Sequence, residues 1–205
     1  VYEQFSESDK VRFQQAYSSS YHPAFEILLE IYQEVASGNE IRSVIMANER
    51  FDRYPMGTID ATPMWVIGEK VRAERSVGVE DRPIDPVTAG VFIATMMAQI
   101  NVLIEHGHSF SEVINESIIE AVDSLNPYID FKGIAHMIDN CSTTARLGAR
   151  KWAPRFGYIL SQQSYPQLSE KVDQQLVDDF LNHMVHPAFD VCATLRPSVD
   201  IAVLN

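Results

Sequence analysis

The chain has 205 residues, 46% of them hydrophobic and 10% aromatic, which is enough for one domain with a sizeable core or two small ones. Its 28 acidic and 16 basic residues give a formal net charge of −12, which argues against duplex nucleic acid or an anionic membrane as a general partner. Cys141 and Cys192 form no CxxC pair, so the sequence has no zinc signature and fits a reducing compartment.

The N-terminal part is predicted to be helical, because apolar residues recur at helical spacing and long alternating strand patterns are absent. Three helices are expected there, at residues 9–17, 23–36 and 39–51. Residues 54–63, which contain two prolines and a glycine, mark the first candidate domain boundary. Val1 is not a natural start, and no signal or transit peptide is visible, so we interpret Val1 as a processed or cut edge.

The helical pattern continues to the C-terminus. Further helices are expected at residues 64–75, 87–106, 111–126, 134–147, from about 152, and as one or two helices over 172–195. Gly107 is expected to end the apolar helix before it, and Ser109 or Ser111 to cap the helix that follows. The longest apolar run, residues 91–98, is too short to span a bilayer. These patterns predict an all-α, bundle-like domain.

Glu112, Glu116 and Glu120 form a ladder of carboxylates at i, i+4 and i+8, which an α-helix stacks on one face. Like charges at this spacing repel, while the apolar residues between them indicate a well-buried helix. Two carboxylates four residues apart can present oxygens to one Mg²⁺ ion, whose other ligands would be water and substrate. Spacing alone also allows a solvated acidic face without a ligand. Glu112 fits that second interpretation best, because acids are favoured in the first turn of a helix.

Residues 139–146 contain a run of small and polar side chains inside an apparent helix, where Ser and Thr compete with the backbone for hydrogen bonds. Their hydroxyls would suit a substrate carboxylate or carbonyl. The alternatives are a helix–helix contact that needs small residues, or a helix that starts at Asp139 or Asn140.

Two other groups of side chains are candidates for binding. A basic cluster could receive an anionic group or the carboxylates of a partner, and consists of Arg146, Arg150, Lys151 and Arg155. Two histidine pairs have spacings that could hold a metal but lack a third ligand nearby, namely His106 with His108 and His183 with His186. Structural or surface roles are therefore favoured for these histidines.

Several long blocks of sequence carry a resemblance to a known family. The blocks are residues 30–44, 88–99, 111–127, 139–148 and 150–156. They closely resemble the C-terminal part of the plant-type (class II) ketol-acid reductoisomerase, also called acetohydroxy-acid isomeroreductase, and the similarity runs from about Phe5 to Val203. The resemblance implies an all-α, knotted helical C-terminal domain that lacks the Rossmann domain. It also implies that residues 1–60 are the tail of the first helical half-domain and residues 61–205 the second half-domain.

The resemblance implies an enzyme of branched-chain amino-acid biosynthesis that acts on 2-acetolactate or 2-aceto-2-hydroxybutyrate. A Mg²⁺-dependent alkyl migration precedes reduction by NADPH, and two Mg²⁺ ions lie between carboxylates from both helical halves. Glu116 and Glu120 match the metal-binding and catalytic carboxylates of the second half, Ser142 matches the substrate-binding serine, and Glu112 has no metal role. The NADPH loop, the catalytic Lys and His and the first-half carboxylates would all precede Val1, so no cofactor-binding residue is expected in this chain.

Two functions remain open at this point. The chain could be the C-terminal portion of an active reductoisomerase, inactive alone, whose Rossmann domain and first helical half come from a larger polypeptide or assembly. It could instead be a non-catalytic scaffold or dimerisation module derived from that enzyme. Retention of Glu116, Glu120 and Ser142 favours the first function, because drift would relieve the repulsive pair. A homodimer or larger assembly is expected, without nucleic acid or a membrane span, in the plastid or alternatively the mitochondrion.

Overall fold

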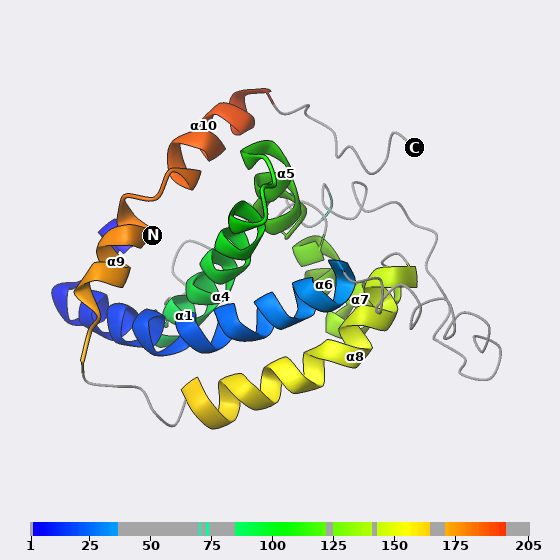
Figure 1. The fold of residues 1–205 in the computed structure, drawn as a ribbon, viewed down its shortest axis with the longest axis horizontal. Coiled ribbons are helices and arrows are strands. Elements are labelled where there is room, and N and C mark those ends of the chain that lie inside the picture. Colours follow the sequence, from blue (N-terminus) through cyan, green and yellow to red (C-terminus); the bar gives the residue numbers. More distant parts are fainter. Residues whose placement is uncertain are drawn as a thin grey trace.

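The computed structural model describes residues 2–36, 70, 73, 85–121, 125–140, 143–164 and 171–195. No strand occurs in these parts of the chain, so the expected all-α class is confirmed (Figure 1). The helices are η1 (Tyr2–Gln4), α1 (Glu7–Ala36), α4 (Pro86–Glu105), α5 (Phe110–Ile114), η3 (Asn115–Ile119), α6 (Asn126–Lys132), α7 (Ile134–Asn140), α8 (Thr143–Ile159), η5 (Leu160–Ser164), α9 (Gln174–Leu181) and α10 (Val185–Leu195).

Several sequence predictions fall outside the described residues. They are the helix at 39–51, the boundary at 54–63, the division between half-domains near residue 60, and most of the helix at 64–75, of which Lys70 and Ala73 are helical. The two half-domains therefore stay a prediction.

The centre of the fold is the crossing of α1 and α4, which carry many of the buried side chains (Figure 1). Small residues four apart line both helices and are buried at the crossing, namely Ala16, Ser20 and Ala24 on α1 and Gly90, Ala94 and Ala98 on α4. A Cβ atom built on Gly90 would lie 2.5 Å from the carbonyl oxygen of Phe13 and 2.7 Å from the Cβ of Ala16. The two backbones thus approach so closely that only glycine fits at this point.

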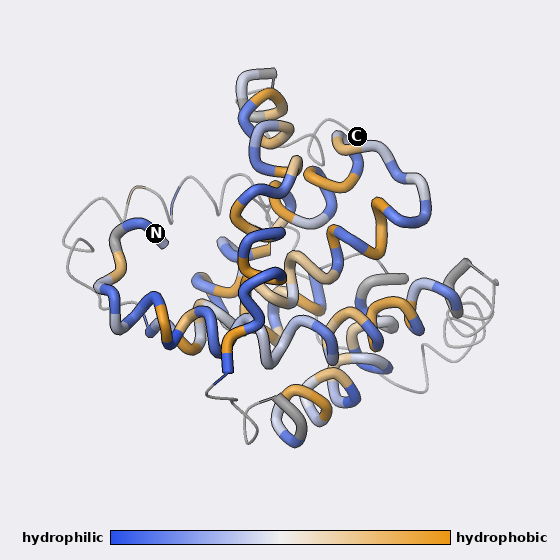
Figure 2. The backbone as a smooth tube through the Cα atoms, turned by 60° about the vertical axis from the view of Figure 1, so that its left-hand side comes forward, coloured by the Kyte–Doolittle hydropathy of each residue, from blue (hydrophilic) through white to orange (hydrophobic). Residues whose placement is uncertain are grey.

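The apolar character of α4 has a structural explanation. By length and composition alone, this is one helix among the described residues that could cross a membrane. Its buried face packs against α1, however, and a helix at the centre of a folded core is apolar for that reason. Hydrophobic and hydrophilic residues alternate along the tube in Figure 2, as expected of helices that each bury one face.

The boundaries of two helices differ from the sequence prediction. α1 is continuous through Pro23, where we expected two separate helices. Pro23 removes one backbone hydrogen bond, and the burial of Tyr17, Tyr21 and Ala24 on either side offsets that cost. α8 runs through Gly148 and Pro154, where we expected a stop and a new start. A terminating glycine takes a positive φ, and among the described glycines only Gly107 and Gly133 do so.

A partly buried polar network joins the C-terminal helices to the core. His183, in the turn between α9 and α10, lies with Nε2 2.8 Å from Asn101 Oδ1 on α4. The amide of Asn101 donates to the Tyr21 hydroxyl on α1 at 2.6 Å, and the backbone N–H of Val185 donates to His183 Nδ1 at 3.0 Å. Because Nδ1 accepts a hydrogen bond, Nε2 carries the proton and donates to Asn101. The expected structural role of His183 is therefore confirmed.

Candidate functional site

The carboxylate helix consists of α5, η3 and Glu120, and carries Glu112, Glu116 and Glu120. It begins at a complete capping box. The Ser109 hydroxyl accepts the backbone N–H of Glu112 at 3.4 Å, and Glu112 Oε2 accepts the backbone N–H of Ser109 at 2.9 Å. Hydrogen bonds from the Ser109 backbone N–H and then from its hydroxyl, followed by the nearby His108, hold the pKa of Glu112 below its ordinary value. Ser109 is thus the cap, and Glu112 serves the helix end as expected.

Beyond this first turn the helix changes type. α5 ends at Ile114 and continues as the π-helix η3 (Asn115–Ile119), in which the N–H of Glu120 donates to the carbonyl of Asn115 five residues earlier. The prediction of a regular α-helix was therefore wrong here. Residues 110–125 contain no proline or glycine that would have indicated a wider turn. Single π-turns inside helices are rare and occur frequently at functional sites.

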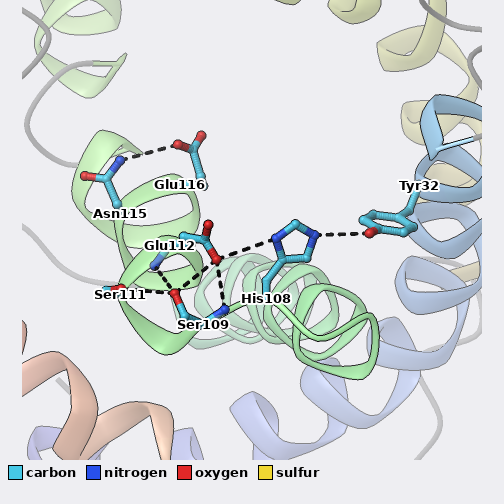
Figure 3. A network of polar contacts seen from close by, with 7 residues as sticks. All are labelled: Tyr32, His108, Ser109, Ser111, Glu112, Asn115 and Glu116. Atoms are coloured by element: carbon cyan, nitrogen blue, oxygen red, sulfur yellow. Dashed lines mark hydrogen bonds and ion pairs between the residues drawn. The ribbon is translucent and has the colours of Figure 1, made fainter.

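Glu116 lies within this π-turn and Glu120 directly follows it. Four residues are slightly less than one π-turn, so the two carboxylates stay on the same side of the helix. Glu116 is exposed, and the side-chain amide of Asn115 donates to its Oε1 at 3.4 Å, a long contact (Figure 3). Glu120 is half-buried. Val113 and Ile114, just before the π-turn, are fully buried and hold this helix in the core.

The chemistry of this pair suits one side of a magnesium site. Carboxylate oxygens are ligands that Mg²⁺ prefers, and Mg²⁺ usually takes only one or two of them from the protein. In the parts of the chain that the structure describes, no group of three or more His, Cys, Asp or Glu could hold a metal ion. A Mg²⁺ ion held by Glu116 and Glu120 would take its remaining ligands from other groups.

The polar run around Ser142 is described only in part. α7 is helical up to Asn140 and α8 from Thr143 on, so the helix expected over 134–147 is present in those of its residues that the structure describes. Cys141 and Ser142 lie outside the described residues, and the role of Ser142 stays a prediction. Just before them, the amide of Asn140 donates to the backbone carbonyl of His136 at 2.9 Å.

The basic cluster is largely engaged within the chain. Arg150 donates to Asp139 on α7, and Arg155 Nη2 donates to Glu30 Oε2 on α1 at 2.6 Å. Arg155 and Lys151 also lie over the ring of Trp152, with centroid distances of 5.5 Å and 4.9 Å. These contacts attach α8 to its neighbours, and they give the cluster a structural role.

A contact between α1 and the carboxylate helix escaped the sequence analysis (Figure 3). The Tyr32 hydroxyl is 3.1 Å from His108 Nε2, and His108 Nδ1 is 3.9 Å from Glu112 Oε2. The ring of Tyr32 also packs at 4.1 Å from that of His106, so the two histidines hold Tyr32 between them. Gly107 allows this tight turn with a φ of 86°. The glycine between two histidines was the available signal, but it did not indicate their partner.

The fold and the site together define an all-α domain with an acidic pair at a π-turn, one carboxylate exposed and the other half-buried. The family model described as "Ketol-acid reductoisomerase, C-terminal domain" matches residues 1–77 and 86–186. The chain therefore belongs to the ketol-acid reductoisomerase family, and the resemblance found in its sequence is confirmed. The matched residues include Glu116, Glu120 and Ser142.

Curated relatives show how much of such a protein this chain spans. It is 56% identical over 211 residues to the chloroplastic ketol-acid reductoisomerase of Spinacia oleracea, a match that covers 99% of this chain and 35% of that protein. The chloroplastic enzyme of Pisum sativum is 54% identical over 99% of this chain and 36% of its own length. The probable mitochondrial enzyme of Schizosaccharomyces pombe is 52% identical over 49% of this chain and 30% of that protein. The chain thus spans 35–36% of the plant relatives.

Proposed function

We propose that this chain supplies the second-half carboxylates of a ketol-acid reductoisomerase. The reaction is a Mg²⁺-dependent alkyl migration in 2-acetolactate or 2-aceto-2-hydroxybutyrate, followed by reduction with NADPH in branched-chain amino-acid biosynthesis. The observation that carries this proposal is the position of Glu116 within a π-turn and of Glu120 at its end, both within the residues that match the family. The names of the spinach and pea relatives support both the enzyme class and a plastid location.

The residues of this chain would have distinct tasks. Bound Mg²⁺ supplies Lewis acidity, which polarises the oxygen atoms of the substrate. Glu116 and Glu120 offer anionic oxygens as ligands, and a carboxylate held beside the substrate can also accept or return a proton. Ser142 would hold the substrate through its hydroxyl. Glu112 is excluded from these tasks because its carboxylate completes the capping box.

The remaining parts of the enzyme would come from outside this chain. The family resemblance places several parts of the enzyme before Val1. They are the Rossmann domain that binds NADPH, the catalytic Lys and His, and the first-half carboxylates. The plant relatives are about three times as long as this chain, which supports a missing partner or preceding segment. We therefore expect the chain to be inactive alone and to act within a larger polypeptide or assembly.

A second candidate function is a non-catalytic scaffold or dimerisation module. Exposed apolar side chains on α9, the following turn and α10 favour it, since such residues suit a contact with another helical surface. These are Leu181, Met184 and Val191, which are 43%, 64% and 59% exposed. A scaffold would need this surface but not the carboxylates, so the two functions predict different effects of changes at Glu116 and Glu120.

The test joins this chain to the upstream two-thirds of the spinach relative and follows NADPH oxidation with 2-acetolactate during a Mg²⁺ titration. We expect activity that Glu116→Gln and Glu120→Gln both weaken by shifting the titration to higher Mg²⁺, because each change removes an anionic ligand. Glu26→Gln, at an exposed glutamate of α1, is the matched control. An unchanged Mg²⁺ titration in both variants would favour the scaffold, and activity of the 205-residue chain alone would refute the expected dependence on missing parts.

A further inference from the structure

In the hydrogen bond between Tyr32 and His108, the charge of Glu112 decides which residue is the donor. A glutamate carboxylate is ionised near neutral pH, and the hydrogen bonds from Ser109 lower the pKa of Glu112 further. That carboxylate lies opposite His108 Nδ1, so we assign the ring proton to Nδ1. Nε2 is then an acceptor, and the hydroxyl of Tyr32 donates to it. The hydrogen bond from Tyr32 to His108 and the charge contact from His108 to Glu112 thus connect α1 with the capping box of the carboxylate helix.

The carboxylate helix needs such a directional contact. α5 has five residues before the helix changes type and continues as η3, and in proteins most of the stability of such a helix comes from its contacts with the rest of the fold. Burial of Val113 and Ile114 holds one side of it, but apolar burial is non-directional. Polar contacts at Ser109 and Glu112 fix the side that faces solvent. The direction of the Glu116 side chain, one turn later, depends both on the apolar burial and on these polar contacts.

The end of α1 also contacts the helix that follows Ser142. Glu30, two residues before Tyr32, pairs with Arg155 of α8 at 2.6 Å. α8 lies alongside α1 in Figure 1, which agrees with this ion pair. The last turns of α1 are therefore in contact both with His108, at the start of the carboxylate helix, and with α8.

We infer that Tyr32 and His108 are positioning residues for the acidic pair: they tie the end of α1 to the first turn of the carboxylate helix and so orient Glu116 and Glu120 toward the metal. This inference rests on the proposed function. Because the contact is exposed, we expect it to affect local order at the carboxylate helix rather than the stability of the whole chain. The side chains of His108 and Glu112 are 38% and 63% exposed, and exposed charged contacts contribute little to stability.

The first experiment measures how the contact between Tyr32 and His108 affects the carboxylate helix, in the 205-residue chain itself and without metal. Amide hydrogen exchange is followed by NMR at residues 114–120 and, for reference, at Ala94 and Ala98 in the core. Tyr32→Phe removes the donor hydroxyl, and we expect exchange at residues 114–120 to accelerate about two- to tenfold, the range of one hydrogen bond, with no change in the core. Tyr158→Phe removes the same hydroxyl at a position that is 66% exposed and is the matched control.

The second experiment measures the effect on metal use in the fusion with the spinach relative. Tyr32→Phe and His108→Leu are expected to raise the half-saturating Mg²⁺ concentration about two- to tenfold while the rate at saturating Mg²⁺ stays close to that of the parent. His108→Gln keeps an amide that can bond Tyr32 and is expected to restore the parent titration.

The outcomes separate this inference from the function on which it rests. If Glu116→Gln shifts the Mg²⁺ titration and Tyr32→Phe does not, the inference is overturned and the proposed function stands. If Glu116→Gln itself has no effect, the proposed function fails and the inference fails with it. Unchanged amide exchange in Tyr32→Phe overturns the inference whatever the metal titration shows.

Discussion

One added methyl group at Gly90 tests the packing that carries this fold. Alanine normally stabilises a helix interior by about 1 kcal/mol relative to glycine, because glycine loses more backbone freedom on folding. At Gly90 the new Cβ would lie 2.5 Å from the Phe13 carbonyl oxygen, 2.7 Å from the Ala16 Cβ and 3.1 Å from the Tyr17 backbone nitrogen. Two of these three atoms belong to the backbone of α1, so no side-chain rotation relieves the clash.

The two helices must therefore move apart for Gly90→Ala to fold. Overpacking of a close-packed interior costs typically about 1–3 kcal/mol and sometimes more. Because separation of α1 and α4 would loosen packing along their whole crossing, we place the clash at the upper end of that range. After subtraction of the helix-propensity gain, we expect a net loss of about 2 kcal/mol in the free energy of unfolding, which lowers Tm by about 4–8 °C in a chain of this size.

Urea and thermal unfolding followed by circular dichroism would measure this loss. Gly148→Ala is the matched control, since Gly148 also lies inside a helix but a Cβ there meets no atom within 4 Å. That variant is expected to be more stable than the parent by up to about 1 kcal/mol. A Gly90→Ala chain as stable as the parent would refute the proposed close approach of α1 and α4.

Two further predictions concern the polar contacts. Burial, followed by repulsion from His186, holds the pKa of His183 below its ordinary value of 6.5, so the unfolded chain takes up this proton first as the pH falls. Stability should then decline below about pH 6.5, and His183→Gln should show less of that decline in urea unfolding between about pH 7.5 and 5.5. Ser109→Ala should cost about 1 kcal/mol through loss of the cap and should raise the pKa of Glu112, measurable by carboxyl NMR titration. The control is Ser161→Ala, which removes an exposed hydroxyl; an equal loss there, or an unmoved Glu112 pKa, would contradict the capping role.

Predictions that depended on local chemistry agree with the structure. Gly107 ends α4 with a positive φ, Ser109 caps the next helix, and residues 172–195 form two helices. Each of these features is encoded within a few neighbouring residues, where a cap or a left-handed glycine has a recognisable sequence pattern.

Predictions failed where distant residues decide the structure. Pro23 and Gly148 are ordinary breaking signals, yet α1 and α8 continue through them because tertiary contacts outweigh local preference. The π-turn at Asn115–Ile119 has no sequence signature of its own. Tyr32 and His108 are 76 residues apart in the chain, so periodicity placed Tyr32 in an apolar stripe and left its hydroxyl without a task. The metal-binding role of Glu116 and Glu120 and the role of Ser142 still rest on the family resemblance.

A substitution in the acidic pair can distinguish a metal-binding enzyme from a non-catalytic scaffold. Like charges four residues apart on a helix cost roughly 0.2–0.5 kcal/mol, and either glutamate could be replaced by glutamine without loss of side-chain volume. If the chain were only a scaffold, Glu116→Gln would be neutral or slightly stabilising and would change nothing else. If the pair binds Mg²⁺, the same substitution should leave the isolated chain at least as stable and yet weaken the assembled enzyme. Stability and activity that change in opposite directions are expected where a sequence keeps an unfavourable arrangement for function. Measured on one variant, the two quantities decide between the enzyme and the scaffold without a structure of the missing half.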